Sequence, residues 1–306
     1  MGSFTAYLPG GAGQAGRVLL PLDGNLYSIG LDGRPPFTIH TPTHTLIDTC
    51  FDRPSFAPNG RWFLCSTTAG IIALDLQTPS DDNVNVALTN QRSISLPAFA
   101  PDGKRFVVNL FADESCELAV YISEPPYDSS LLVTGLLFPD LVAPGYTTQS
   151  GFAQACDMTD VTWSPDGNRI AFIAGRGGEV WTSHLYALDL RMIALPSDVA
   201  TEPARAITIP AGVVHDYGAI TYVGDIGTNL TWPQGTDTVS MPHGNQIINI
   251  NLRTNERHAI LSVEDAEICA ASWTPGGAQL FFALCHPVHS NPDTSAPPPE
   301  LYVYTP

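Results

Sequence analysis

An all-β fold built from repeated units is predicted by two features of the sequence. A turn containing proline and glycine follows an aromatic residue and precedes an apolar run five times, at residues 55–60, 98–103, 162–167, 231–235 and 272–277. The chain also holds 26 glycines and 27 prolines, whereas charged residues make up only 14%, which suits many short strands joined by turns. Because units this short cannot bury an apolar face alone, neighbouring copies must pack against one another.

Each turn is followed by a stretch rich in aromatic and β-branched residues, which favours a β-strand. The stretches of this first kind are residues 61–65, 105–108, 169–173 and 279–283. A second apolar stretch recurs at residues 26–29, 71–76, 118–122, 185–190, 246–251 and 301–304. The second kind has six copies, so we expect the amino terminus to supply a sixth unit whose turn is degenerate.

Residues 162–167 read Thr-Trp-Ser-Pro-Asp-Gly and continue as Asn-Arg-Ile-Ala-Phe. This pattern resembles the TolB-like β-propellers, also called WD40-like or PD40 repeat proteins, whose signature is an aromatic-Ser-Pro-Asp-Gly turn before an apolar strand. The resemblance implies a six-bladed β-propeller of four-stranded antiparallel blades, with the ring closed by pairing of the N- and C-terminal strands. Residues 17–306 would form this single domain, and residues 1–16 a flexible leader or a first edge strand.

The charge balance argues against a nucleic-acid partner. Thirty acidic residues against 13 basic ones give a formal net charge of −17, which repels phosphate backbones. The sequence contains no apolar run of 18 residues, so we expect no membrane span.

Six cysteines predict an oxidising compartment. Cys50 and Cys65 flank one turn and Cys269 and Cys285 another, so each pair lies on adjacent antiparallel strands that a bridge can join. The remaining pair is Cys116 and Cys156. We therefore predict the bridges 50–65, 116–156 and 269–285, with six buried free thiols as the alternative. Such bridges indicate an extracytoplasmic protein that is secreted, periplasmic or on the cell surface.

A loop-rich rim is the predicted functional surface. In the expected blade order the turns line one face, and the long segments 38–54, 125–160, 193–228 and 284–300 gather on the opposite one, where a rigid scaffold usually presents its binding residues. The candidate ligand-binding residues on this rim are His184, His215, Asp216, His243, His286, Asp160 and Trp181.

No cofactor is predicted, except that a divalent metal ion at the channel mouth is left open. Histidine is the commonest metal ligand, and His184, His215, His243 and His286 are the candidate ligands. The alternative is that the loops expose these histidines singly. Asp160, just before the best-matched inner strand, is the acidic residue most suited to the central channel.

Residues 131–143 form a strongly apolar segment between two repeats. One interpretation is a short strand or helix packed on the disc. The other is an exposed apolar lip, formed with Tyr146 and Phe152, that binds a partner.

The leading functional hypothesis is an extracytoplasmic binding or assembly module that recognises a protein or peptide through its loop-rich face. No catalytic residue is assigned, because the sequence contains none of the hydrolase or phosphate-loop motifs. Two alternatives remain. One is a metal-dependent carbohydrate lyase or hydrolase, and the other is a structural subunit of an extracellular assembly, which would involve self-assembly.

Overall fold

The computed structural model describes residues 5–7, 17–22, 25–30, 38–40, 54–67, 70–75, 84–89, 93–112, 115–128, 130–141, 157–176, 182–193, 195, 206–210, 212–220, 230–274, 277–285 and 300–306. Within these ranges the regular structure is β-strand, apart from two short 3-10 helices, η2 (Pro139–Leu141) and η3 (Leu190–Met192). This part of the chain holds no helix with the length and apolar character needed to cross a bilayer.

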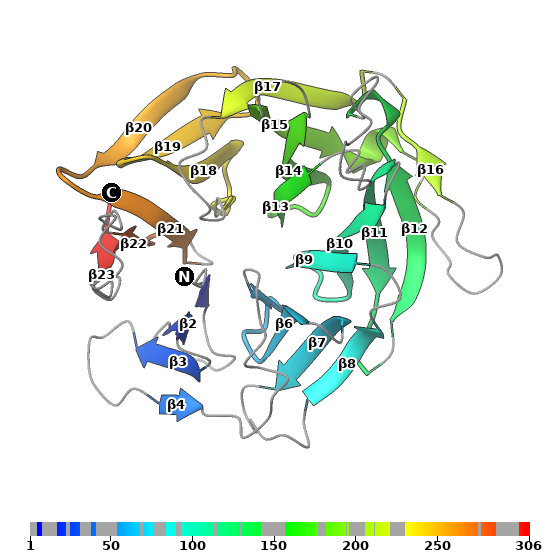
Figure 1. Cartoon of the computed structure of the whole chain (residues 1–306), viewed down its shortest axis with the longest axis horizontal. Coiled ribbons are helices and arrows are strands. Elements are labelled where there is room, and N and C mark those ends of the chain that lie inside the picture. Colours follow the sequence, from blue (N-terminus) through cyan, green and yellow to red (C-terminus); the bar gives the residue numbers. More distant parts are fainter. Residues whose placement is uncertain are drawn as a thin grey trace, which may run out of the picture.

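Five sheets pack side by side as propeller blades, with their first strands nearest the centre and their last strands outermost (Figure 1). The first blade contains β5 (Ser55–Phe56), β6 (Trp62–Thr67), β7 (Gly70–Asp75) and β8 (Val84–Thr89). The second contains β9 (Ser93–Phe99), β10 (Arg105–Ala112), β11 (Ser115–Ile122) and β12 (Leu131–Leu137), with β16 (Ile207–Thr208) added at its outer edge. The third contains β13 (Asp157–Trp163), β14 (Arg169–Arg176), β15 (Thr182–Asp189) and β17 (Val214–Ile220). The fourth blade contains β18 (Thr238–His243), β19 (Gln246–Asn251) and β20 (Arg257–Ser262). The fifth contains β21 (Glu267–Trp273), β22 (Leu280–Cys285) and β23 (Glu300–Tyr304).

A further sheet precedes these blades in the chain. It is formed by β1 (Thr5–Tyr7), β2 (Arg17–Leu22), β3 (Asn25–Gly30) and β4 (Thr38–His40), and only its backbone is described. Its first strand, β1, lies near β5 and β21.

The predicted ring of six four-stranded blades closed by the chain ends is wrong in two respects. Over the residues that the structure describes, the packed blades number five, and they contain three to five strands rather than four throughout. The chain ends do not share a sheet either. The β23 strand is held by β22, with Tyr304 opposite Leu280, whereas β1 is held by β2, with Thr5 opposite Leu19. Each terminal strand therefore pairs with its neighbour in sequence, and among the described strands no pairing between the two chain ends closes the ring.

The core lies between the blades, so most inner strands are buried on both faces. On β14, Ile170 and Phe172 pack toward the β9–β12 blade, whereas Ala171 and Ile173 pack toward the β18–β20 blade. All four side chains are buried. Alternate residues of a strand face opposite sides, so burial of both sides requires a continuous apolar run. This explains why the strands after the turns read as uninterrupted apolar stretches.

The apolar segment 131–143 packs into the fold over its described part. It forms β12 and then η2, and Leu136, Phe138 and Leu141 are buried against the next blade. The interpretation as a packed strand is therefore correct for residues 131–141. Tyr146 and Phe152, invoked for an apolar lip, lie outside the described residues.

Two of the six cysteines carry described side chains, and both Cys65 and Cys269 are disulfide-bonded. Both are also buried. Their predicted partners Cys50 and Cys285, and the side chains of Cys116 and Cys156, fall outside the described side chains. The pairings 50–65, 116–156 and 269–285 therefore stay predictions.

Candidate functional site at the centre of the propeller

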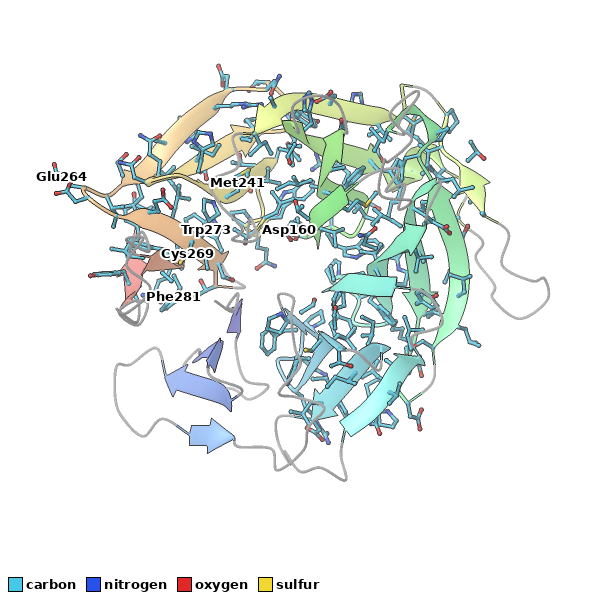
Figure 2. The ribbon with its side chains drawn as sticks, in the orientation of Figure 1. Asp160, Met241, Glu264, Cys269, Trp273 and Phe281 are labelled. Atoms are coloured by element: carbon cyan, nitrogen blue, oxygen red, sulfur yellow. The ribbon has the colours of Figure 1, made fainter. Side chains whose placement is uncertain are left out.

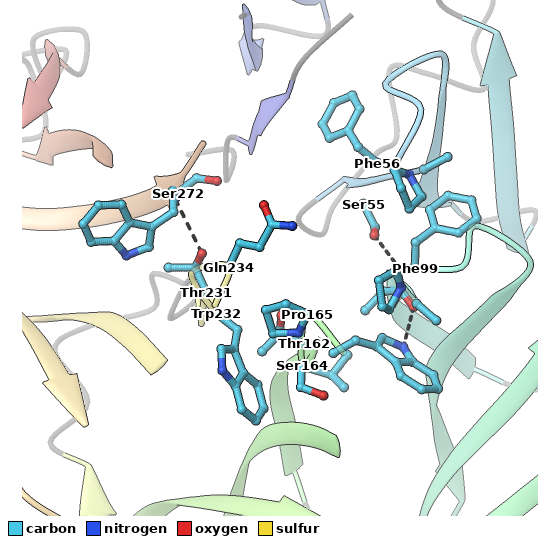
Figure 3. Close-up of a pocket in the computed structure, with 18 of the residues that line it drawn as sticks. Ser55, Phe56, Phe99, Thr162, Ser164, Pro165, Thr231, Trp232, Gln234 and Ser272 are labelled. Carbon is cyan, nitrogen blue, oxygen red and sulfur yellow. Dashed lines mark hydrogen bonds between the residues drawn. The ribbon is translucent and has the colours of Figure 1, made fainter. Parts of the chain in front are cut away.

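A pocket of about 400 Å³ lies at the centre of the propeller, where the inner ends of the five blades converge (Figure 3). Each of the five turn motifs contributes to its wall. One lining residue from each motif is Phe56, Phe99, Thr162, Gln234 and Ser272. Binding pockets in proteins are commonly of this size, with mainly apolar walls and a few placed polar groups.

Carboxylates fix the backbone of two turns beside the pocket. The Asp102 carboxylate accepts hydrogen bonds from the backbone N–H groups of Lys104, at 2.8 Å, and Arg105, at 2.9 Å. Asp166 likewise accepts from the Asn168 N–H at 3.1 Å. Burial alone raises the pKa of both carboxyl groups, but these hydrogen bonds favour the charged form and leave each pKa below its usual value.

Glycine completes each turn at a positive φ, and in two of the turns it also allows a close approach to the preceding blade. Gly103 has φ +68°, and a Cβ on it would lie 3.3 Å from Pro58 of the previous turn. Gly167 has φ +70°, and a Cβ on it would lie 3.3 Å from Pro101. The turns thus contact one another in succession around the pocket.

Hydrogen bonds between neighbouring inner strands hold the wall. The Ser55 hydroxyl accepts from the Phe99 N–H at 2.8 Å, and the Trp163 indole N–H donates to the Ala98 carbonyl at 3.0 Å. The Trp273 indole donates to the Ser240 hydroxyl at 2.8 Å. Each of these bonds joins two blades. They orient the large rings between the blades and leave the pocket open.

Few polar side chains are left to contact a ligand. The amide of Gln234 extends into the pocket (Figure 3) and makes no hydrogen bond within the described part of the chain, and the same holds for the Thr162 hydroxyl. Asp160 is the ionisable residue of the described lining and lies near the axis (Figure 2). Its buried carboxylate accepts from the backbone N–H groups of Val161, at 2.8 Å, and Leu230. The wall therefore offers apolar surface, an amide, a hydroxyl and one anchored negative charge.

Two of the predicted rim residues meet, away from this pocket. The His184 Nδ1 lies 2.9 Å from both carboxylate oxygens of Asp216, which joins the outer strands β15 and β17. His215 directly precedes Asp216 on β17 and is placed opposite Ala187, so it points to the other face of the sheet. His243 ends β18 in a different blade.

The remaining candidates do not form a described site. Trp181 and His286 lie outside the described residues. Where side chains are described, no three His, Cys, Asp or Glu residues gather in a way that would hold a metal ion. The metal site on His184, His215, His243 and His286 is therefore still a prediction.

The central pocket was missed because its residues belong to the repeat motif, which sequence reasoning treats as structural. Ser55, Thr162, Thr231 and Ser272 occupy the same position, directly before the aromatic residue of each motif, and all four line the pocket. A small hydroxyl residue repeated at one place in successive inner strands was the available signal.

Comparisons with known proteins identify the fold. No protein-family model and no curated protein sequence matches the chain. Among solved structures, TolB from Acinetobacter baumannii superposes with a TM-score of 0.52 at 17% identity, over 85% of this chain and 54% of that one. A protein from Agrobacterium tumefaciens described as a TolB superposes with a TM-score of 0.52 at 15% identity, over 85% of this chain and 81% of that one. The chain thus spans about half the length of the first of these proteins, and its fold is a TolB-like β-propeller.

Proposed function

We propose that this chain is a binding module that recognises a segment of a protein or peptide at the central pocket. The observation that carries this proposal is the convergence of five turn motifs on one preformed opening of about 400 Å³. Its walls are fixed by hydrogen bonds between blades, whereas the Gln234 amide and the Thr162 hydroxyl face the opening. Walls that are already ordered lower the entropic cost of binding.

The charge of the chain favours a neutral or basic segment. The formal net charge is −17, and Asp160 is the ionisable residue of the described lining. A field of this sign speeds the encounter with a cationic partner and slows that with an anionic one. The long loop segments of the predicted rim belong, in the expected blade order, to the face opposite the turns, and most of them lie outside the described residues, so their role in binding stays a separate prediction.

A peptide library displayed on phage and selected against the intact chain tests this function. We expect the selected peptides to lose at least about tenfold in affinity for Gln234→Trp, measured by fluorescence anisotropy, because the indole fills the opening. Met192→Trp adds the same ring at an exposed position of η3 and should bind as the wild type does. Selected peptides that bind Gln234→Trp and the wild type equally would rule out the central pocket.

An extracytoplasmic location is part of the proposal. It is supported by the disulfide bonds of Cys65 and Cys269, because such bonds persist mainly in oxidising compartments. Finding all six thiols free in protein from its native source would contradict it. The carbohydrate-enzyme and assembly-subunit alternatives stay predictions.

A further inference from the structure

A second cavity, of about 190 Å³, lies away from the axis between two blades. One wall comes from the segment after β12, with Phe138 and Leu141, and another from Ile209, which follows β16. The third wall comes from the next blade, with Tyr186 of β15 and Val214 of β17. In one blade β12 pairs with β16, in the next β15 pairs with β17, and the outermost strands β16 and β17 lie at the edge of the disc (Figure 1). The cavity is separate from the central pocket.

The floor of this cavity is aromatic. Tyr186 is buried and stacks on Phe172, with ring centroids 5.5 Å apart and an interplanar angle of 25°. It also stacks on His184, with centroids 6.0 Å apart and an angle of 18°. Phe138 packs against Phe172, with ring centroids 5.1 Å apart. Rings that are held in this way give a rigid apolar surface on which another ring can pack.

One carboxylate lies at the mouth of the cavity. Asp216 lines the cavity, and its side chain is 41% exposed. Its position is fixed by His184 Nδ1, at 2.9 Å from both oxygens, and by the Gly218 N–H, which donates to Oδ1 at 2.7 Å. Two carboxylate oxygens offer about four acceptor positions, so these contacts leave capacity for another donor. A fixed, partly exposed negative charge therefore borders an apolar cavity.

We propose that this cavity binds a small primary amine carried on an aromatic ring, with the ring inside the cavity and the ammonium group on Asp216. The size agrees with this, because a cavity of roughly 150 Å³ already accepts benzene and 190 Å³ leaves room for a short arm. Charge agrees as well. An ammonium group forms a charge-assisted hydrogen bond with a carboxylate, whereas an anion at this mouth meets repulsion. A purely apolar ligand fills the cavity but leaves the carboxylate without the additional donor.

Titration of the intact chain with phenethylamine, followed by isothermal calorimetry, tests the proposal. We expect saturable binding with one site per chain. Phenethyl alcohol, which keeps the ring and lacks the charge, should bind at least about tenfold more weakly, and so should methylamine, which keeps the charge and lacks the ring. No saturable binding of phenethylamine, or equal affinity for the alcohol, would overturn the proposal.

Two variants locate the site. Asp216→Asn removes the charge and should weaken phenethylamine binding at least about tenfold, whereas Glu264→Gln makes a similar change at an exposed position and should bind as the wild type does. Val214→Phe fills the cavity and should abolish binding while Asp216 is still present. Thermal melts confirm that each variant is folded. Binding that survives both Asp216→Asn and Val214→Phe would place the amine elsewhere and overturn the proposal. Gln234→Trp, at the central pocket, should leave amine binding unchanged.

Discussion

Arginines at the starts of the second strands join neighbouring blades. The guanidinium of Arg105 lies 5.3 Å from the ring centre of Trp163 in the next blade, and that of Arg169 lies 4.8 Å from the ring centre of Trp232. Arg169 also pairs with Asp237 of that next blade at 2.5 Å. Contacts of a cation with an indole face contribute about 0.5–2 kcal/mol each. Arg105 and Arg169, which the sequence places only at the start of a strand, therefore also connect each blade to the next.

Tyr127 joins two blades in a different way. Its ring makes edge contacts with Trp62, at 5.6 Å between centroids, and Phe99, at 5.3 Å, while its hydroxyl donates to the Gly103 carbonyl at 2.9 Å. Burial raises the pKa of Tyr127 to about 12, and the nearby carboxylates of Asp102 and Glu124 add to this. The folded chain therefore holds the phenol proton more tightly than the unfolded chain, whose tyrosines titrate near pH 10.

We predict that Tyr127 makes the fold sensitive to alkali. Its contribution is complete below about pH 10 and is lost as the pH rises toward about 12, because the unfolded chain then gains more by ionising. Tyr127→Phe should lower the free energy of unfolding by about 1 kcal/mol at pH 7, because its hydrogen bond is lost. Between about pH 10 and about pH 12 the free energy of unfolding of this variant should then fall less steeply than that of the wild type. Tyr304→Phe on β23 is the control. Urea unfolding across the pH range measures both effects, and equal slopes for Tyr127→Phe and the wild type would contradict the prediction.

At the scale of the elements, contacts between successive turns organise the centre of the disc. Two glycines allow their turns to approach the proline of the turn before, as Gly103 does with Pro58 and Gly167 with Pro101. The repeat motif therefore has two roles, since it reverses the chain within a blade and sets the spacing between blades. The outer strands are joined separately, where the Tyr217 hydroxyl of β17 donates to the Leu252 carbonyl of the next blade at 2.7 Å.

A pair of glycine substitutions separates these two roles. Gly167→Ala and Gly212→Ala both place a side chain at positive φ, +70° and +84°, which costs about 1–2 kcal/mol. At Gly167 the added methyl group also meets Pro101 at 3.3 Å, whereas at Gly212 it meets nothing within 4 Å. We expect Gly167→Ala to lower the free energy of unfolding in urea by about 1 kcal/mol more than Gly212→Ala does. Equal losses would show that the contact between turns contributes no stability.

At the scale of the whole molecule, sequence reasoning succeeds where burial is uniform. The strands predicted after the turns at residues 105–108 and 169–173 correspond to the starts of β10 and β14, because strands that are buried on both faces need continuous apolar runs. The outer strands are different. The half-exposed residues of β17 mix polar and apolar types, and β16 has two residues, so the pattern does not reveal how many strands a blade contains.

The sites were harder to predict than the strands, for a physical reason. His184 and Asp216 are 32 residues apart and meet only because β15 pairs with β17 around a bulge, a register that local sequence does not determine. The central pocket depends in turn on how five blades converge. Ser55 and Thr162 carry the same repeated signal, but the repeat indicates packing as readily as binding.

Covalent bridges add the last contribution to the stability of the whole molecule, and their pairing can be measured. Proteolysis without reduction, followed by mass spectrometry, should yield peptides linked as 50–65, 116–156 and 269–285, the pairing that the sequence predicts. A bridge that closes a loop of roughly 15 residues restricts the unfolded chain and stabilises the fold by about 3 kcal/mol. Reduced and alkylated protein should therefore melt at a lower temperature than the oxidised form. A link between Cys65 and Cys269 themselves would contradict the pairing, because it would join two different blades where the prediction joins adjacent strands within each one.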